Sequence, residues 1–400
     1  MNQRPFYFLL ISTLVSEIAF NLPMGALPLA LLRDGATHSE VAFAMGGGVF
    51  AQLFGSVPIG AVVDRVGRLR MVRASVILVS LSTFGMTFLH GPVWGGLLMG
   101  LRGFSATSYV TAEFAYVSEI IPKERSVSAV SILGTIGNVV FAFAPALAVW
   151  MWNHGIGREQ FSYAGLIALA GGTVLWFLPR GHGARRTKRR SRLILMRSKW
   201  LPAMGFLSAV AMQSGVNTAL AVVTFTQRGI GNGALIFTSM AIMAAALRYP
   251  AARAVERFGV GAVVLPVAAV QIAGCLAAAS AHSAGTVLLA GALLGCAWSA
   301  VVPVGVALFF QHSSPGTRGV AMGAYNLSFA IGSSSGALLA ALLTRFGLSY
   351  ATAISACALA PLLALPFVYL RIVRREPAAR TGIPPDAGSP SQRPDQALRK

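Results

Sequence analysis

Acidic residues are scarce in this sequence of 400 residues: 12 Asp and Glu stand against 32 Lys and Arg, and charged residues make up only 11% of the chain. A soluble domain carries roughly a quarter charged residues, because its surface must face water. Here hydrophobic residues make up 55% of the chain, and the mean hydropathy is +0.68. The composition therefore excludes a soluble globular protein.

Cysteine and histidine are also few. The three cysteines, Cys275, Cys296 and Cys357, lie singly inside apolar stretches, with no spacing that suggests a metal site. The six histidines fall in connections or at the ends of apolar stretches. The sequence contains no phosphate-binding loop of the kind that hydrolyses ATP. We therefore expect neither a metal nor an organic cofactor.

Long apolar stretches dominate what is present. Each is about long enough to cross a hydrocarbon core of roughly 30 Å at about 1.5 Å per residue of helix. Backbone groups in lipid must be satisfied within their own segment, so these stretches predict helices. The sequence thus predicts an all-α membrane protein with twelve transmembrane helices, at 6–32, 41–63, 71–89, 93–118, 127–152, 161–178, 200–226, 234–252, 260–281, 285–310, 319–343 and 350–370.

The formal net charge of +20 could indicate a nucleic-acid-binding protein, but the placement of the charge does not. If the N-terminus lies in the cytoplasm, the cytoplasmic segments hold 26 Lys and Arg and the opposite segments only four. This asymmetry follows the positive-inside rule, so we expect both termini to be cytoplasmic in a cell (inner) membrane. The excess charge is expected to meet anionic lipid headgroups, and no nucleic acid is expected as a partner.

The chain divides into two halves of six predicted helices. We expect an N-terminal bundle at 1–179, a basic cytoplasmic linker at 180–199, a C-terminal bundle at 200–371 and a disordered cytoplasmic tail at 372–400. Four motifs recur at offsets of 192 to 196 residues: Asp64–Gly67 as Glu256–Gly259, Pro122–Arg125 as Pro315–Arg318, Glu17–Asn21 as Gln213–Asn217, and Arg33 as Arg228. Parallel repeats of this kind are a standard transporter plan.

The sharpest motif lies between the second and third predicted helices and comprises Gly60, Asp64, Arg65, Gly67 and Arg68. It resembles the cytoplasmic signature of the major facilitator superfamily (MFS), and the resemblance extends to length, helix count, central basic loop and repeat. It implies two pseudo-symmetric bundles of six helices, with the substrate site between them. In that family the motif acts as a gate, latching the halves together on the cytoplasmic side while the cavity opens outward.

Three ionisable residues are candidates for proton coupling: Glu17, Arg102 and Glu113. Leu101-Arg102-Gly103 resembles the start of the family's fourth-helix motif, whose arginine is implicated in proton-coupled transport. Glu17 lies mid-span, and ionisable groups at that depth are functional by default. Glu17 as a permanently neutral, hydrogen-bonded residue, and Glu113 as an ordinary acid near the cytoplasmic interface, are the alternatives.

Polar and aromatic residues near the middle of several predicted helices are candidates for substrate binding. They are Asn21, Tyr109, Gln213, Asn217, Trp298, Tyr325 and Asn326. Asn and Gln in membrane helices can equally serve only to join neighbouring helices.

The sequence favours a secondary transporter, with proton-coupled efflux of a neutral or cationic small molecule ahead of proton-coupled uptake of a metabolite or sugar. Ala144-Pro145-x-x-Ala148 approximates the Gly-Pro-x-x-Gly of proton-driven drug antiporters, with alanine in place of both glycines. A membrane enzyme would need a clustered catalytic constellation, and a transporter-like sensor usually adds a domain; neither is evident. We expect a monomer that acts on a small-molecule substrate.

Overall fold

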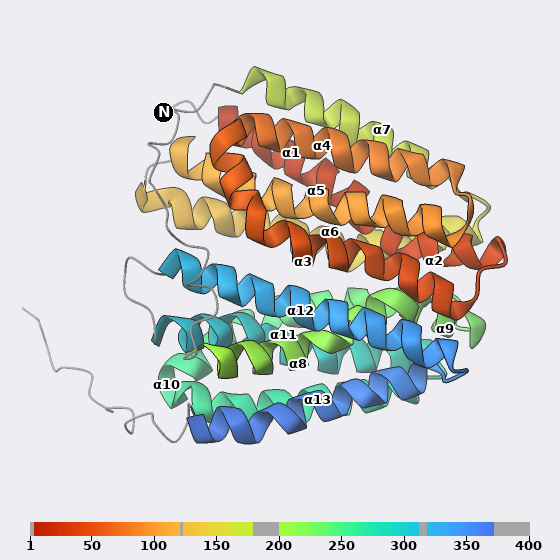
Figure 1. Ribbon diagram of the computed structural model, residues 1–400, viewed down its shortest axis with the longest axis vertical. Coiled ribbons are helices and arrows are strands. Elements are labelled where there is room, and N and C mark those ends of the chain that lie inside the picture. Colours follow the sequence, from red (N-terminus) through yellow and green to blue (C-terminus); the bar gives the residue numbers. More distant parts are fainter. Residues whose placement is uncertain (1–3, 121–122, 179–199, 312–317, 372–400) are drawn as a thin grey trace, which may run out of the picture.

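The computed structural model describes residues 4–120, 123–178, 200–311 and 318–371 and is almost entirely helical. Figure 1 shows two bundles side by side, α1–α7 and α8–α13. The first contains α1 (Arg4–Asn21), α2 (Pro23–Arg33), α3 (His38–Val66), α4 (Arg68–Gly85), α5 (Gly91–Ile120), α6 (Lys123–Asn153) and α7 (Glu159–Gly172), with the short 3₁₀ helices η1 (Met86–Phe88) and η2 (Thr173–Phe177). The predicted linker and tail lie outside the described residues.

The second bundle contains α8 (Leu201–Val216), the π-helical turn η3 (Asn217–Ala221), α9 (Val222–Gln227), α10 (Leu235–Ala279), α11 (Ala284–Gln311), α12 (Arg318–Arg345) and α13 (Tyr350–Arg371). The helices of both bundles overlap the twelve predicted spans. The first span is α1 and α2 together, and the seventh is α8, η3 and α9. The 45-residue α10 covers two spans, because Gly259 interrupts its helical geometry. The all-helical membrane fold is confirmed.

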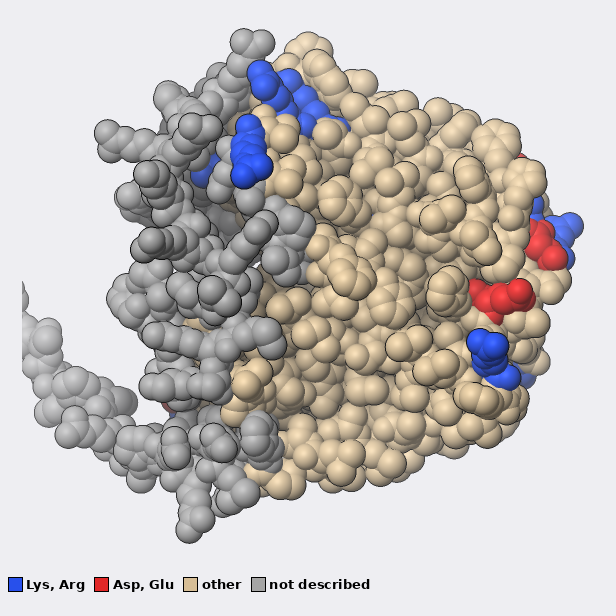
Figure 2. All heavy atoms as spheres, viewed as in Figure 1, with Lys and Arg blue, Asp and Glu red and all other residues tan. Residues whose placement is uncertain are grey.

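Length and composition alone single out eight helical segments in the described part as able to cross a membrane. Large apolar side chains cover the outside of the bundles: Phe177 is 75% exposed and Leu363 80%. In water such a surface would aggregate, whereas in a bilayer it contacts acyl chains. On the face shown in Figure 2, charged side chains lie toward the two ends, and the broad surface between them is uncharged. The exterior thus fits a protein that spans a bilayer.

The sequence repeat extends to backbone conformation. Glycines with positive φ recur in both halves, as Gly35 and Gly229, Gly67 and Gly259, and Gly155 and Gly347, at offsets of 194, 192 and 192 residues. Each pair follows the corresponding helix of its half. Side chains other than glycine are strained at such φ values, so these glycines end one helix and redirect the chain into the next. The two halves therefore share turns as well as helices.

Glycine also sets how closely helices approach within each bundle. A Cβ atom added to Gly103 of α5 would collide with the Gly48 carbonyl of α3. In the second bundle, a Cβ on Gly215 of α8 would collide with the Ser333 carbonyl of α12. Small residues at such crossings bring two membrane helices into backbone contact, which supplies packing energy where the hydrophobic effect does not.

The two bundles meet mainly through α3 against α12 and α6 against α10. Four hydrogen bonds between described residues cross from one bundle to the other. They are His38 Nε2 to Gln227 Oε1 at 2.8 Å, Ser39 Oγ to the Ala341 carbonyl at 2.9 Å, Asn153 Nδ2 to the Gly231 carbonyl at 2.6 Å, and Asn232 Nδ2 to the Ala146 carbonyl at 2.8 Å. These contacts lie toward the end that holds Asp34 and Arg345, which we call the opposite end. The other end, with Arg65, Arg68 and Arg257, is the basic end.

Candidate functional site

Glu17 lies near the middle of the first span, where α1 ends and α2 begins. Asn21, one turn later, donates its amide to Glu17 Oε2 at 2.9 Å and to the Glu17 carbonyl at 2.9 Å. The Glu17 carboxyl also faces Gly137 of α6, where an added Cβ would stand 3.5 Å from its carbon. Glu17 is half-buried, whereas Asn21 is 3% exposed. The carboxylate thus lies deep in the bundle and is still within reach of solvent.

A helix break directly follows this pair. Pro23 lacks an amide hydrogen, so the Ala19 carbonyl cannot receive its usual helical bond. Thr83 of α4 donates its hydroxyl to that carbonyl at 3.0 Å. The neighbouring Phe20 carbonyl accepts a bond from Arg102 Nε of α5 at 2.9 Å. The proline therefore frees one backbone acceptor beside Glu17, and neighbouring helices bond to it and to the next carbonyl.

Arg102 is 2% exposed, and its guanidinium carbon stands 4.2 Å from the centre of the Phe20 ring. A cation in this position gains from the Phe20 carbonyl and from the aromatic face, which offset part of the desolvation cost. Arg102 and Glu17 also attract each other electrostatically. The predicted pair is thus brought together in one bundle, with the arginine held by backbone and ring, and with the carboxylate held by Asn21.

Glu113 lies further along α5, in a separate buried cluster. Its Oε1 accepts a hydrogen bond from Tyr109 Oη at 3.0 Å and a short one from the Thr13 hydroxyl of α1. Glu113 is 2% exposed, so it is not an acid at a watery interface. Arg102, Tyr109 and Glu113 of α5 therefore all contact α1, and Tyr109 and Glu113 are bonded to each other.

Sequence reasoning missed Thr13. A signal was present, because Thr13, Glu17 and Asn21 are spaced four residues apart and must share one face of the helix. A hydroxyl one turn before an intramembrane carboxylate is thus readable from the sequence. Its contact with Glu113 is not, since that contact joins residues 100 positions apart on different helices.

The equivalent residues in the second half form a neutral copy of the Glu17 pair. Asn217 donates its amide to Gln213 Oε1 at 2.7 Å, and Tyr350 of α13 donates its hydroxyl to Asn217 Oδ1 at 2.7 Å. Gln213 is 0% exposed and Asn217 1%. In this conformation both lie inside the second bundle, away from solvent.

The other predicted substrate-binding residues of the second bundle divide into two groups. Trp298 and Tyr325 both pack edge-on against Phe329, at ring-centre distances of 5.3 and 5.0 Å. Asn326 is exposed on α12 and lies eleven residues before Ala337. Eleven residues complete about three turns, so Asn326 shares the face on which Ala337 meets Gly46 of α3. Asn326 therefore faces the first bundle, whereas Tyr325 is part of an aromatic core.

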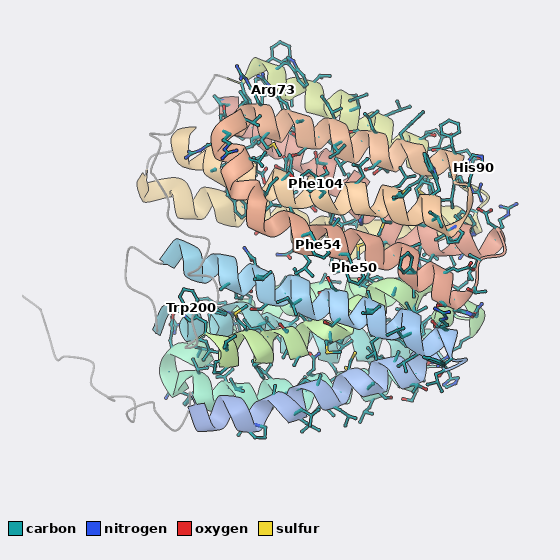
Figure 3. All side chains as sticks on the ribbon, viewed as in Figure 1. Phe50, Phe54, Arg73, His90, Phe104 and Trp200 are labelled. Atoms are coloured by element: carbon teal, nitrogen blue, oxygen red, sulfur yellow. The ribbon has the colours of Figure 1, made fainter. Side chains whose placement is uncertain are left out.

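Aromatic side chains lie on the facing helix of the first bundle. Phe50 and Phe54 belong to α3 and lie between α3 and α12 in Figure 3. Phe54 is 75% exposed. Phe104 of α5, in contrast, packs behind α3 against Gly55. The surface between the bundles thus carries aromatic and amide side chains.

The predicted gating motif forms the turn from α3 to α4. Gly67 has φ 98° and ψ 139° and serves as the end of one helix and the start of the next. Arg68 Nη1 donates to the Ala115 carbonyl of α5 at 2.8 Å, and Arg65 is exposed. Gly60 and Asp64 lie within α3, and the side chain of Asp64 is outside the described part. The motif is therefore in direct contact with the fourth span.

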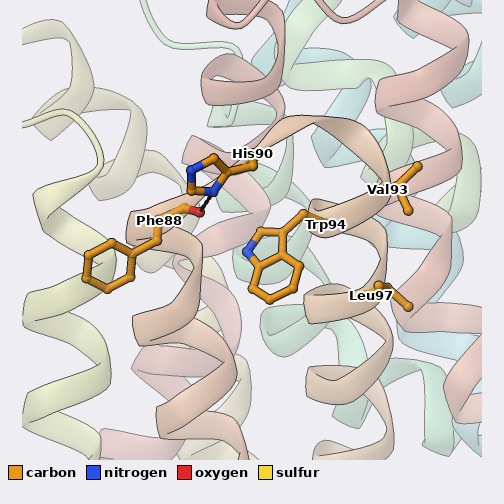
Figure 4. Close-up of a pocket in the computed structure, with 5 residues that line it drawn as sticks. All are labelled: Phe88, His90, Val93, Trp94 and Leu97. Carbon is orange, nitrogen blue, oxygen red and sulfur yellow. Dashed lines mark hydrogen bonds between the residues drawn. The ribbon is translucent and has the colours of Figure 1, made fainter.

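One further hollow lies on the outside of the first bundle, around the connection from α4 to α5. Figure 4 shows it lined by Phe88, His90, Val93, Trp94 and Leu97, with a volume of about 510 Å³. Val93 is 69% exposed, and His90 bonds only to the Phe88 carbonyl among the residues drawn. The five lining residues include none of the candidate coupling or gating residues, so the hollow is separate from the site around Glu17.

Comparison with known proteins gives one family. The family model described as Major Facilitator Superfamily matches residues 9–240 and 230–397. The chain is 24% identical over 105 residues to the uncharacterized MFS-type transporter YhjO of Bacillus subtilis, covering 26% of each protein. It is 27% identical over 144 residues to the uncharacterized MFS-type transporter YcaD of Escherichia fergusonii, covering 35% of this chain and 36% of that protein. The alignments thus span well under half of either relative.

Solved structures share the fold over nearly the whole chain. A bacterial homologue of the human lysosomal transporter Spinster, in an inward-facing and occupied conformation, superposes with a TM-score of 0.72 at 14% identity, over 92% of this chain and 96% of that one. The nucleoside transporter NupG gives a TM-score of 0.71 at 13% identity, over 92% of this chain and 99% of that one. At such identities the likeness concerns the fold.

Proposed function

The chain belongs to the major facilitator superfamily and is a membrane transporter rather than an enzyme, and from this premise we propose that it couples the efflux of a small organic solute to proton entry. The observation that carries the proposal is the environment of Glu17. Proton exchange needs a carboxyl group that can hold its proton in one conformation and release it in another.

Three features suit Glu17 to that task. It is half-buried beside a helix break, so a small movement of α2 changes its access to solvent. Asn21 donates a hydrogen bond that stabilises the ionised form. Arg102, anchored to the Phe20 carbonyl, adds a positive charge nearby, and burial opposes both effects by favouring the neutral acid. Because these opposing influences depend on packing, a conformational change can switch the protonation state.

The orientation of the protein in the membrane follows from the distribution of its basic residues. With the basic end in the cytoplasm, both termini are cytoplasmic, as the positive-inside rule requires. The hydrogen bonds between the bundles then close the outer side, and the protein is in an inward-facing state. The solved Spinster homologue with the same fold carries the description inward-facing, which supports this assignment. The membrane is the cell (inner) membrane, and the protein acts as a monomer.

The proposed direction, efflux, rests on α6. Pro145 resembles the proline of the proton-driven drug antiporters, and its carbonyl is so close to Gly25 of α2 that an added Cβ would collide with it. This contact joins the fifth span to the first, only four residues beyond Asn21. Movement of α6 is thereby transmitted to α2, which follows Glu17 across the helix break.

The proposed substrate is a neutral or cationic organic molecule. Glu17 supplies a half-buried carboxylate, and Phe54 and Asn326 supply aromatic and amide side chains between the bundles. A multivalent anion would need several exposed cationic groups, whereas Arg102 is buried and already bonded.

The test uses proteoliposomes with an imposed pH gradient and a panel of labelled neutral, cationic and anionic solutes. We expect the wild type to accumulate a neutral or cationic member of the panel, and Glu17→Gln to abolish accumulation while retaining exchange without a gradient. Glu40→Gln, which removes an exposed carboxylate outside the bundle interior, is the matched control. Undiminished gradient-driven transport by Glu17→Gln would contradict the proposal.

A further inference from the structure

The first bundle contains a second buried carboxylate that coupling through Glu17 alone leaves without a role. Glu113 is bonded to Thr13 of α1 and to Tyr109 of its own helix, and all three are at most 5% exposed. An ionisable group that is only structural in a membrane bundle is costly, because glutamine would form the same contacts without the risk of charge. The question is whether this site can hold Glu113 in both protonation states.

Hydrogen-bond counting shows that it can. When Glu113 is ionised, its Oε1 accepts from both the Thr13 hydroxyl and Tyr109 Oη. When Glu113 is protonated, its own O–H can donate to the Thr13 oxygen. The Thr13 hydrogen then turns to the Leu9 carbonyl, which lies 2.8 Å away. Rotation of a hydroxyl therefore satisfies either state without movement of the backbone.

Thr13 also lies close to Glu17 along α1. The two residues lie one turn apart on α1, so their side chains share a face of the helix. Ser16 lies between them, is 5% exposed, and its hydroxyl has no hydrogen-bond partner among the described residues. A buried hydroxyl without a partner is uncommon in folded proteins and calls for an explanation. Here the Ser16 hydroxyl offers a donor and an acceptor between Thr13 and Glu17 along α1.

The charged surroundings of Glu113 come from several helices. Glu17 on α1 is close enough to interact with it electrostatically. Arg102 lies three turns earlier on α5, and Tyr109 lies one turn earlier. On α4, Arg68 of the gating motif is bonded to the Ala115 carbonyl, two residues beyond Glu113. The cluster thus lies between Glu17 and the basic end.

We propose that Glu113 is a second proton-binding residue, which exchanges its proton with Glu17 through the hydroxyls of Thr13 and Ser16 on the basic-end side of the site. The inference rests on the proposed proton coupling. In the transfer, the O–H bond of one carboxyl group breaks while an O–H bond forms on the other, and each hydroxyl gains one proton as it gives up another. No net charge is created, because one carboxylate replaces the other.

The consequence for transport is a proton route that does not pass through the substrate surface. Glu17 is half-buried, whereas Glu113 is enclosed by α1 and α5. Because the gating motif touches α5 beside Glu113, a change in that turn can open or close the end of the route. Substrate entry and proton release then use different paths on the cytoplasmic side of the membrane.

Infrared spectroscopy of the full-length protein in lipid tests this route directly, with heavy water as the probe. Protonated carboxyl groups absorb in a region clear of the amide bands, and Glu113→Gln is expected to remove one such signal on the acid side of a pH titration. After a switch to heavy water, Glu17→Gln should slow hydrogen–deuterium exchange at the enclosed Glu113 carboxyl by at least about tenfold, because the route to Glu113 begins at the half-buried Glu17. Thr13→Val should slow that exchange without removing a carboxyl signal.

The control is Thr83→Val, which removes another hydroxyl bond to α1, at the Ala19 carbonyl, and should leave the exchange rate unchanged. Unaltered exchange at Glu113 in both Glu17→Gln and Thr13→Val would overturn the proposal. So would a Glu113 signal that never changes with pH, since that carboxyl would be permanently neutral. Either outcome can occur while Glu17→Gln still abolishes gradient-driven transport, so the two proposals fail independently.

Discussion

The first spans of the two halves share one arrangement of side chains, with an ionisable residue in the first half and a neutral one in the second. In each, an Asn one turn beyond the key residue donates its amide to that residue, at 2.9 Å to Glu17 and 2.7 Å to Gln213. In each, regular α-helix stops immediately afterwards, at Leu22 in one half and in the π-helical turn Asn217–Ala221 in the other. Only the first half carries a carboxylate there.

The difference follows from the neighbouring helix. In the first half, α5 brings Arg102 beside Glu17, whereas the matching helix α11, Ala284–Gln311, contains no charged residue. A carboxylate at position 213 would therefore lie in a 0% exposed site with no counter-charge from that helix. The hydrogen bond is thus present with and without charge, and the carboxylate stands only in the half whose neighbouring helix supplies a cation.

A carboxylate introduced at the equivalent position of the second half should have the largest effect on stability. We expect Gln213→Glu to destabilise the protein by about 2.5–3.5 kcal/mol, the cost of an acid at the centre of a membrane helix. The mirror change, Glu17→Gln, should cost less stability, because Arg102 loses its counter-charge but keeps the Phe20 carbonyl and ring. Thermal unfolding in detergent measures both, and equal stability of Gln213→Glu and wild type would show that the second half can accept a carboxylate.

The repeated turns allow a second comparison. Gly67→Ala and Gly259→Ala each place a side chain at positive φ, 98° and 79°, and each should cost about 1–2 kcal/mol of stability. Only Gly67→Ala should also impair transport, because Gly67 positions Arg68 against the Ala115 carbonyl, whereas Val260 follows Gly259. Stability is read from unfolding and transport from proteoliposomes. Equal transport losses in the two variants would mean that the turns are mechanically equivalent.

The smallest expected effect concerns the starts of the second and eighth spans. Thr37 and Glu40 form a reciprocal cap on α3, whereas Asn232 Oδ1 accepts from the Ala234 amide before α10. Bonds from the Thr37 amide and hydroxyl hold the pKa of the exposed Glu40 below its usual value of 4.5. A lowered folded-state pKa stabilises the protein above pH 4.5, and this contribution disappears as the pH falls through the lower value.

Glu40→Gln should therefore slightly loosen the first turn of α3 near neutral pH and make no difference in strong acid. Backbone hydrogen exchange in that turn, measured across the acid range, tests this, and Glu159→Gln, which removes another acid from the first turn of a helix at the same end, is a suitable control. A difference that persists in strong acid would show that the effect is not electrostatic.

Much of the fold is predictable because the bilayer constrains it. The lengths of the apolar stretches place the helices, and Gly67 and Gly259 mark matching turns. The break at Pro23 and the π-helical turn at Asn217 lie within predicted spans and were not anticipated, because hydropathy measures apolar length and not backbone hydrogen bonding. Tyr325 and Asn326 are adjacent in sequence and equally plausible as binding residues, yet only helix packing turns one inward and the other toward the first bundle.

The sequence by itself determined the membrane environment, the repeat, the orientation expected from charge, and the depth of Glu17 and Arg102, since each depends on position along a helix of fixed rise. Only the tertiary structure decided that Arg102 bonds to the Phe20 carbonyl, that Thr13 meets Glu113, and that Tyr350 covers Asn217. These contacts join residues 82 to 133 positions apart. These contacts depend on the rotation of each helix about its axis and on the small residues that let helices approach. Neither can be deduced from the sequence of one helix alone.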